Sequence, residues 1–130
     1  MYSCGFSELF SRAPKAIAHI TGCGANGYVS GEISIRSRGT GSVILLEAVN
    51  LPAVKSGLLI PAFEPADGSE LFVLNPVKIY SGYVLCAVYF PAAPSRLNGA
   101  AVTLCEAVIS PGGVIRGSRI GQGRIKKFSE

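Results

Sequence analysis

Alternating side chains from Gly82 to Tyr89 constrain the fold of this chain more than any other feature. Because side chains along a strand point in turn to opposite faces, two sets of residues emerge. One face carries Gly82, Val84, Cys86 and Val88, and the other carries Tyr83, Leu85, Ala87 and Tyr89. Phe90-Pro91 ends this strand, since proline has no N–H for the ladder. A second strand is predicted at Ala101–Cys105, after the Asn98-Gly99 turn signal.

Similar short apolar runs recur along the whole chain between Gly, Pro and Asn-Gly turn signals. The expected strands are Ala16–Ile20, Tyr28–Ser37, Ser42–Val49, Gly57–Phe63, Leu71–Ile79, Gly82–Tyr89, Ala101–Cys105 and Arg119–Lys127. Eight short strands at regular spacing predict an all-β, eight-stranded Greek-key β-sandwich or barrel. The composition agrees, with 48% hydrophobic residues, 16 glycines and 8 prolines in 130 residues. We expect residues 1–13 to form an N-terminal arm and residues 14–130 to form one domain.

The position of one proline limits the fourth predicted strand. Pro61 interrupts the apolar run from Gly57 to Phe63. Because proline cannot donate to a ladder, this strand is expected to be bent or to lie at a sheet edge.

The chain offers few residues for catalysis or metal binding. Its four cysteines, Cys4, Cys23, Cys86 and Cys105, show no CxxC spacing, and His19 is the single histidine. A zinc site needs about four such ligands, and a Cys–His or Ser–His pair needs a base near the nucleophile. We therefore expect no cofactor. We also expect His19 to be packed or hydrogen-bonded in its strand, Cys86 to lie in the core, and Cys105 to lie outside the barrel.

Carboxylates do not suggest acid–base chemistry either. Glu32 and Glu47 each face away from the apolar set of their strand. They are interpreted as surface residues.

Charge and hydropathy restrict the compartment and the partners. No apolar run approaches the roughly 18 residues of a membrane span, and the N-terminus lacks the pattern of a signal peptide. A cytoplasmic location without membrane contact is the expectation. The net charge is +4, and five of the 12 basic residues lie between Arg116 and Lys127. We interpret this stretch as a solvated edge strand protected by charge rather than a nucleic-acid site, because only Phe128 supplies an aromatic ring nearby.

Several segments together resemble the bacterial Cu/Zn superoxide dismutases. The segment NPVKIYSGYVLCAVYF, from Asn75 to Phe90, is similar to the family's "LPPLLVNNGYA" region. The segment from Leu97 to Glu106 resembles its "IIGRTVVIHE" strand, and the segment from Gly117 to Ile125 resembles its "GSRIACGVI" ending. Ala16–Gly22 with Val29–Ile33 resembles the family's first hairpin, and Asn50-Leu51-Pro52 resembles its "GLP". The resemblance covers roughly Pro14 to Lys126 and implies that family's Greek-key barrel.

The resemblance also implies that the metal site is lost. Two copper histidines of the family's "FHVHE" strand fall on Pro61 and Phe63, and a later one falls on Cys105. The loop that carries the remaining ligands is shortened to about ten residues between Phe63 and Val73. Only the arginine that attracts superoxide has a counterpart, Arg119, which would then be vestigial.

These observations lead to one functional hypothesis and two alternatives. We expect a non-catalytic superoxide-dismutase-like domain that acts through protein contacts, as a homo-oligomer or with another protein. Pro61, Phe63 and Cys105 are its candidate interaction face, because loss of the metal loop would expose apolar residues there. One alternative is Cu(I) binding or dismutation through Cys105, helped by Cys4, Cys23 or ligands from another subunit. The other is anion or nucleic-acid binding through Arg116 to Lys127.

Overall fold

A computed structural model describes residues 14–127, and this part of the chain is all β, without an α-helix. The strands are β1 (Ala16–Gly22), β2 (Ser30–Arg38), β3 (Gly41–Val49), β4 (Leu58–Glu64), β5 (Phe72–Val73), β6 (Val77–Lys78), β7 (Val84–Phe90), β8 (Ala101–Ser110), β9 (Gly113–Arg124) and β10 (Lys126–Lys127). Two 3-10 turns, η1 (Gly24–Asn26) and η2 (Pro94–Leu97), lie in connections. The predicted all-β class is confirmed, whereas the predicted N-terminal arm lies outside the described residues. Within residues 14–127 no helix has the length and hydropathy needed to cross a bilayer.

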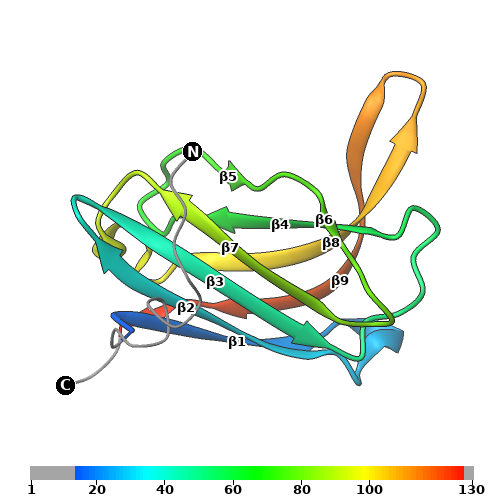
Figure 1. Ribbon diagram of the computed structural model, residues 1–130, viewed down its shortest axis with the longest axis horizontal. Coiled ribbons are helices and arrows are strands. Elements are labelled where there is room, and N and C mark those ends of the chain that lie inside the picture. The colour runs from blue at the N-terminus through cyan, green and yellow to red at the C-terminus, as the bar shows by residue number, and fades with distance from the viewer. Residues whose placement is uncertain (1–13, 128–130) are drawn as a thin grey trace.

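One antiparallel sheet contains all the strands (Figure 1). Its strand order is β5-β4-β8-β9-β1-β2-β3-β7, with β6 also pairing with β4 and β10 with β1. Strands β1, β2 and β3 follow one another as hairpins, and the chain then crosses from β3 to β4 and later from β7 to β8. β5 and β7 are the two outermost strands in this order. They are not consecutive in sequence, and they do not pair with each other.

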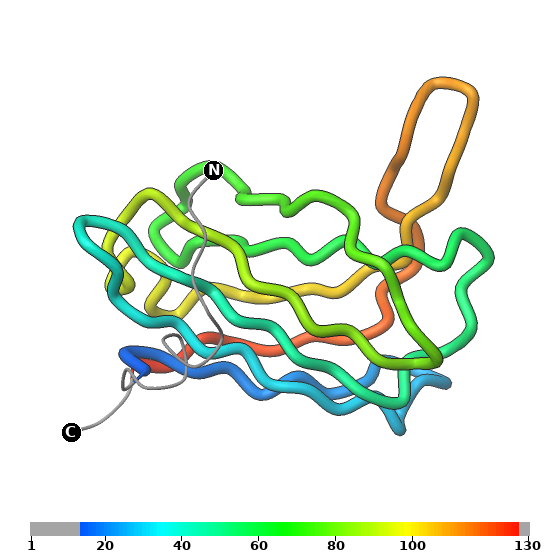
Figure 2. The backbone as a smooth tube through the Cα atoms, in the orientation of Figure 1, coloured from blue at the N-terminus to red at the C-terminus, as the bar shows by residue number. Residues whose placement is uncertain are grey.

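The sheet curls into a half-barrel, so that its two ends approach each other (Figure 2). The ring of Phe72 on β5 lies 4.9 Å from the ring of Phe90 on β7, measured between centroids. Tyr80 and Tyr83 exchange backbone hydrogen bonds beside this seam. Side chains and one isolated bridge, rather than a continuous strand ladder, thus join the two ends.

The core fills the inside of the curl with one face of each long strand. Its fully buried large side chains are Phe63, Ile20, Ile33, Ile35, Ile44, Leu46, Leu59, Leu97, Leu104, Ile125, Val84 and Val102. Within the strands, the period of two in the sequence places these residues on one face, because successive strand side chains alternate. Leu97 belongs to η2, and Ile125 lies between β9 and β10. Cys86 packs against this core and is partly buried, close to the expectation.

The prediction that β4 is an edge strand is wrong in part. Strand β4 pairs with β8 on one side and with the short strands β5 and β6 on the other. Pro61 accepts a hydrogen bond from the Leu74 N–H through its carbonyl oxygen at 2.9 Å, so its ring nitrogen faces the β5–β6 side. The register shows pairs at Ala62 and Phe63 with β5 and at Leu58 and Leu59 with β6, but none at Pro61. The proline therefore lies where the neighbouring strand is interrupted and no donor is required.

The ladder between β8 and β9 is longer than predicted. Expected strands at Ala101–Cys105 and Arg119–Lys127 extend to a hairpin that turns at Pro111-Gly112, and its end projects from the body of the sheet (Figure 1, orange). Register shifts on either side of Cys105 mark a bulge where this projection begins. Isolated two-stranded ribbons are marginal in water, so the continuous ladder below the bulge supports this hairpin.

Candidate functional site

Pro61, Phe63 and Cys105 do not form an exposed face, contrary to the prediction. All three are buried, Phe63 completely. In the β4–β8 register Pro61 lies opposite Leu104 and Phe63 opposite Val102, both core residues. Cys105 lies opposite Ile60, on the other face of the sheet. The prediction that Cys105 faces away from the core agrees with this register. The prediction that Cys105 is exposed is wrong, because the residue is buried.

Among the predicted site residues, Arg119 is placed directly opposite another one, Cys105. It lies opposite Cys105 in the β8–β9 ladder. Its guanidinium is exposed and donates to the Gln122 Oε1 at 3.2 Å. The residue opposite Cys105 in this ladder is therefore a cation and not a second thiol.

The cysteines are dispersed. Among residues 14–127, no group of three or more His, Cys, Asp or Glu side chains has a spacing that could hold a metal ion. Cys4 lies outside the described residues. Burial raises the pKa of the Cys86 thiol to about 11, so this residue is protonated at neutral pH. Thiolate is the form that binds soft metals, and Cys86 therefore is a poor ligand near pH 7.

His19 is exposed, so the packed alternative of its prediction is wrong. Its Nδ1 lies 3.9 Å from the Glu32 Oε2, and the two side chains are 80% and 55% exposed. Glu32 and Glu47 both lie on the surface, as predicted. A solvated pair of this kind contributes little to stability and offers no nucleophile to activate.

The interpretation of the basic stretch as an edge strand is wrong in part. β9 lies between β8 and β1 at Gly121 and Gln122, whereas its part with Arg116 pairs with β8 alone. Arg119 and Arg124 are exposed on its outer face, and Arg124 donates to the Gly99 carbonyl oxygen at 2.8 Å. The charged residues lie on the exposed face of a half-buried strand, and the other face, with Ile120, enters the core.

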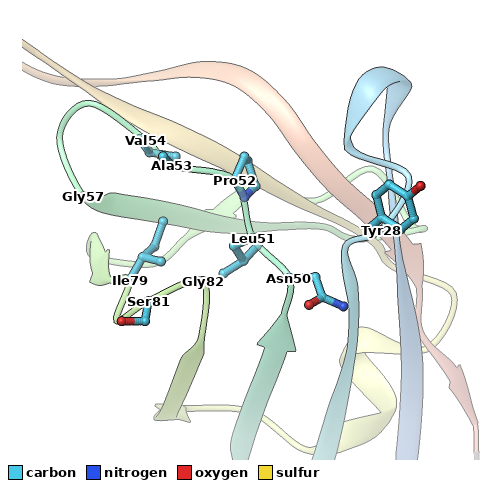
Figure 3. A pocket seen from close by; sticks show the side chains of 10 residues that line it. All are labelled: Tyr28, Asn50, Leu51, Pro52, Ala53, Val54, Gly57, Ile79, Ser81 and Gly82. Carbon is cyan, nitrogen blue, oxygen red and sulfur yellow. The ribbon is translucent and has the colours of Figure 1, made fainter.

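A depression of about 730 Å³ lies where the turn after β3 meets the turn before β7 (Figure 3). Asn50 and Ser81, both labelled in that view, have positive φ angles of 58° and 51°. The Leu51 N–H donates to the Gly82 carbonyl oxygen at 3.0 Å and holds the two turns together. Its lining carries no ionisable group other than the Tyr28 phenol, so the depression has no acid–base pair.

A second, apolar depression lies along the seam between β5, β6 and β7. Its volume is about 480 Å³, and Val73, Tyr80, Leu85 and Val88 are among the residues that line it. Lys78 is the single charged residue of this lining, and its Nζ lies 5.1 Å from the centre of the Tyr80 ring. We name this depression the β7 groove.

Strand β7 borders the β7 groove with exposed apolar side chains. Leu85 is 38% exposed and Tyr89 is 53% exposed, and Ala87 between them is exposed as well. The sequence contained this signal, because Tyr83, Leu85, Ala87 and Tyr89 form an apolar set opposite the core set. A strand that is apolar on both faces is usually buried on both faces. In β7, however, the outer set of side chains is exposed to solvent.

The outer backbone edge of β7 is also unoccupied by any other described strand. β7 pairs only with β3 among the strands of residues 14–127. Glu47 on β3 accepts a hydrogen bond from the Tyr83 hydroxyl at 2.6 Å, just before β7 begins. The carboxylate raises the pKa of Tyr83, because ionising the phenol would remove the donor and place two negative charges together.

No protein-family model matches this chain. No curated protein matches it either.

Proposed function

We propose that this protein is a superoxide-dismutase-like Greek-key domain that lacks the family's metal ligands and acts through protein contacts, including contacts with its own copies. The strand order supports the Greek-key part, since the β3–β4 and β7–β8 crossovers place strands distant in sequence side by side. The residues at the ligand positions support the non-catalytic part. Pro61 and Phe63 have no metal-binding atoms in their side chains, and Cys105 lies beside Ile60 and Arg119.

One observation carries the interaction role, namely the exposed apolar strand β7. Its sequence from Val84 to Phe90 is VLCAVYF and contains no charged residue and no proline. Edge strands of monomeric proteins are usually short, charged, bulged or interrupted by proline, because a flat apolar edge recruits other chains. A surface of this kind, next to an apolar groove, is typical of a protein-interaction site.

The test is sedimentation velocity over a wide range of protein concentration, together with metal analysis and a dismutation assay on the same sample. After incubation with copper and zinc and removal of free metal by a chelator, we expect less than about one tenth of an equivalent of metal to remain on the protein. We expect no dismutation above that of the buffer alone. We expect the sedimentation coefficient to rise with protein concentration. Stoichiometric copper with activity would contradict the non-catalytic part, and a constant monomer coefficient would contradict self-contact.

A further inference from the structure

We propose that the Asn26-Gly27 pair at the end of η1 is a modification site, where the Gly27 backbone nitrogen displaces ammonia from the Asn26 side chain and water then leaves aspartate or isoaspartate in its place. The reaction needs no enzyme, and water is its only other reactant. This inference goes beyond the proposed function and does not depend on it.

The reaction joins two atoms that are close along the backbone. The Gly27 nitrogen loses its proton to the solvent and attacks the Asn26 Cγ, the Cγ–Nδ2 bond breaks, and the side-chain nitrogen leaves as ammonia. The product is a five-membered succinimide ring. Water opens this ring at the Cγ to give aspartate, or at the backbone carbonyl carbon of Asn26 to give isoaspartate. Glycine favours ring closure because it has no Cβ to obstruct the approach and restricts backbone rotation least.

The sequence contains three pairs in which glycine follows Asn or Asp, namely Asn26-Gly27, Asp67-Gly68 and Asn98-Gly99. All three can form the ring, so the dipeptides alone do not distinguish them. The attacking nitrogen must lose its proton and turn toward the side chain, and a hydrogen bond from its N–H opposes both. The backbone around each pair therefore decides which one reacts.

The Asn98-Gly99 pair is held by several hydrogen bonds. The Gly99 N–H donates to the Ile125 carbonyl oxygen at 2.9 Å, and the Gly99 carbonyl oxygen accepts from Arg124 at 2.8 Å. The Ile125 N–H donates in turn to the Ala100 carbonyl oxygen at 2.9 Å. Bonds of this kind in a packed segment open together rather than singly, so the Gly99 nitrogen is protected.

The Asp67-Gly68 pair is protected in a different way. The Asp67 carboxylate accepts hydrogen bonds from the Ser69 hydroxyl and, at 2.8 Å, from the Ser69 N–H. These two bonds lower the pKa of Asp67 and keep it ionised at neutral pH. The ring forms from the protonated carboxyl, whose hydroxyl leaves as water, so the ionised form does not react. The Gly68 N–H also donates to the Pro65 carbonyl oxygen at 3.3 Å.

The Asn26-Gly27 pair has neither protection. Gly27 is exposed and Asn26 is partly buried. The Asn26 N–H donates to the Cys23 carbonyl oxygen at 3.0 Å, but within residues 14–127 no backbone carbonyl accepts from the Gly27 N–H at hydrogen-bond geometry. Space is also open here, since a Cβ at Gly27 would meet no heavy atom within 4 Å. The Gly27 nitrogen is therefore free to approach the Asn26 side chain.

The modification changes a carbonyl group that the turn uses. The Asn26 carbonyl oxygen accepts from the Val29 N–H at 3.0 Å, and a Cβ at Gly22 would lie 1.6 Å from the same oxygen. In isoaspartate this carbonyl becomes a free carboxylate, and the chain continues through the Cβ and Cγ instead. Tyr28 follows directly and lines the depression of Figure 3, so we expect this end of the molecule to change. The new carboxylate also lowers the formal net charge from +4 to +3.

The experiment incubates the folded full chain at neutral and mildly alkaline pH and follows each pair by peptide mass spectrometry, with chromatography to separate aspartate from isoaspartate. We expect Asn26 to be converted at least about tenfold faster than Asn98, because the Gly99 N–H must first lose its bond. In guanidinium chloride the two asparagines should be converted at similar rates, since the difference comes from the fold. The rate at Asn26 should rise with pH, because the attacking nitrogen must lose its proton.

Gly27→Ala is the matched variant. The φ angle of Gly27 is −60° and the space for a Cβ is open, so alanine fits without strain. We expect conversion of Asn26 to slow at least about tenfold in this variant, with Asn98 and the melting temperature unchanged. Conversion of Asn98 as fast as that of Asn26 in the folded chain would overturn the proposal. Wild-type Asn26 that is converted no faster than in Gly27→Ala, or not at all while the denatured chain is converted, would overturn it as well.

Discussion

Phe63 and Cys105 lie on opposite faces of the paired strands β4 and β8. Phe63 is opposite Val102 in the ladder and faces the core, whereas Cys105 is opposite Ile60 on the other face. The two residues correspond to copper-ligand positions in the resemblance to superoxide dismutases, and their arrangement here cannot bring them to one ion. The Phe63 side chain is part of the core, where its ring lies 6.1 Å from that of Phe72.

Replacing Phe63 by alanine should lower the free energy of unfolding by about 3–5 kcal/mol, because it removes a completely buried ring and leaves a cavity. Urea denaturation followed by circular dichroism measures this change. Tyr28→Ala is the matched control, since Tyr28 is 86% exposed and its removal should change stability by less than about 0.5 kcal/mol. Equal effects of the two substitutions would contradict the placement of Phe63 in the core.

The Glu47 carboxylate raises the pKa of Tyr83 through their hydrogen bond. Since the folded-state pKa exceeds the unfolded value of about 10, this bond stabilises the fold below about pH 10 and its contribution is lost as pH rises through the folded-state pKa. Glu47→Gln should therefore lower the pKa of Tyr83. Ultraviolet absorbance titration near 295 nm measures it, with Tyr83→Phe identifying the signal of this residue. An unchanged titration in Glu47→Gln would argue against the bond.

The Cys86 thiol should react slowly with iodoacetamide, because burial raises its pKa to about 11. At pH 8 roughly one part in a thousand of such a thiol is thiolate. As long as the pH is below the pKa, raising it by one unit increases the thiolate fraction about tenfold. Mass spectrometry of alkylated peptides measures the rate at several pH values. Cys23, which lies in the connection between β1 and η1 rather than against the core, is the internal control and should react faster. Similar rates for both cysteines at pH 8 would contradict this expectation.

Adding a methyl group at Gly41 should destabilise the fold by about 1–3 kcal/mol. A Cβ there would contact the Tyr89 ring and would lie 2.8 Å from the Phe90 carbonyl oxygen. The ring is exposed and able to move, whereas the carbonyl belongs to the β3–β7 ladder. Tyr89→Ala should therefore relieve only part of the cost of Gly41→Ala, and a double-mutant cycle of unfolding free energies measures the shared part. Full relief would show that the backbone contact is unimportant.

Local patterns in the sequence determined which segments are strands. The alternation in Gly82–Tyr89 and in Tyr28–Ser37 predicted β7 and β2 to within a few residues, because side-chain direction in a strand depends only on neighbours in sequence. The β8–β9 hairpin turns at Pro111-Gly112, where the backbone preferences of Pro and Gly act locally.

Pro61 shows where local information ended. The missing N–H required a position without a ladder donor, and the sequence therefore suggested an edge strand. The fold meets that requirement in another way, by interrupting the neighbouring strand between β5 and β6. The reason is that the partner of a strand is set by packing between distant segments.

Only the tertiary structure decided that the outer face of β7, with Leu85, Ala87 and Tyr89, stays exposed. It also decided that Phe63 and Cys105 face opposite ways and that β9 lies between β8 and β1 at Gly121 and Gln122. Each of these facts depends on strand order and on the closure of the curl. A period of two separates two faces but carries no information about which other strands, far away in the sequence, will cover them.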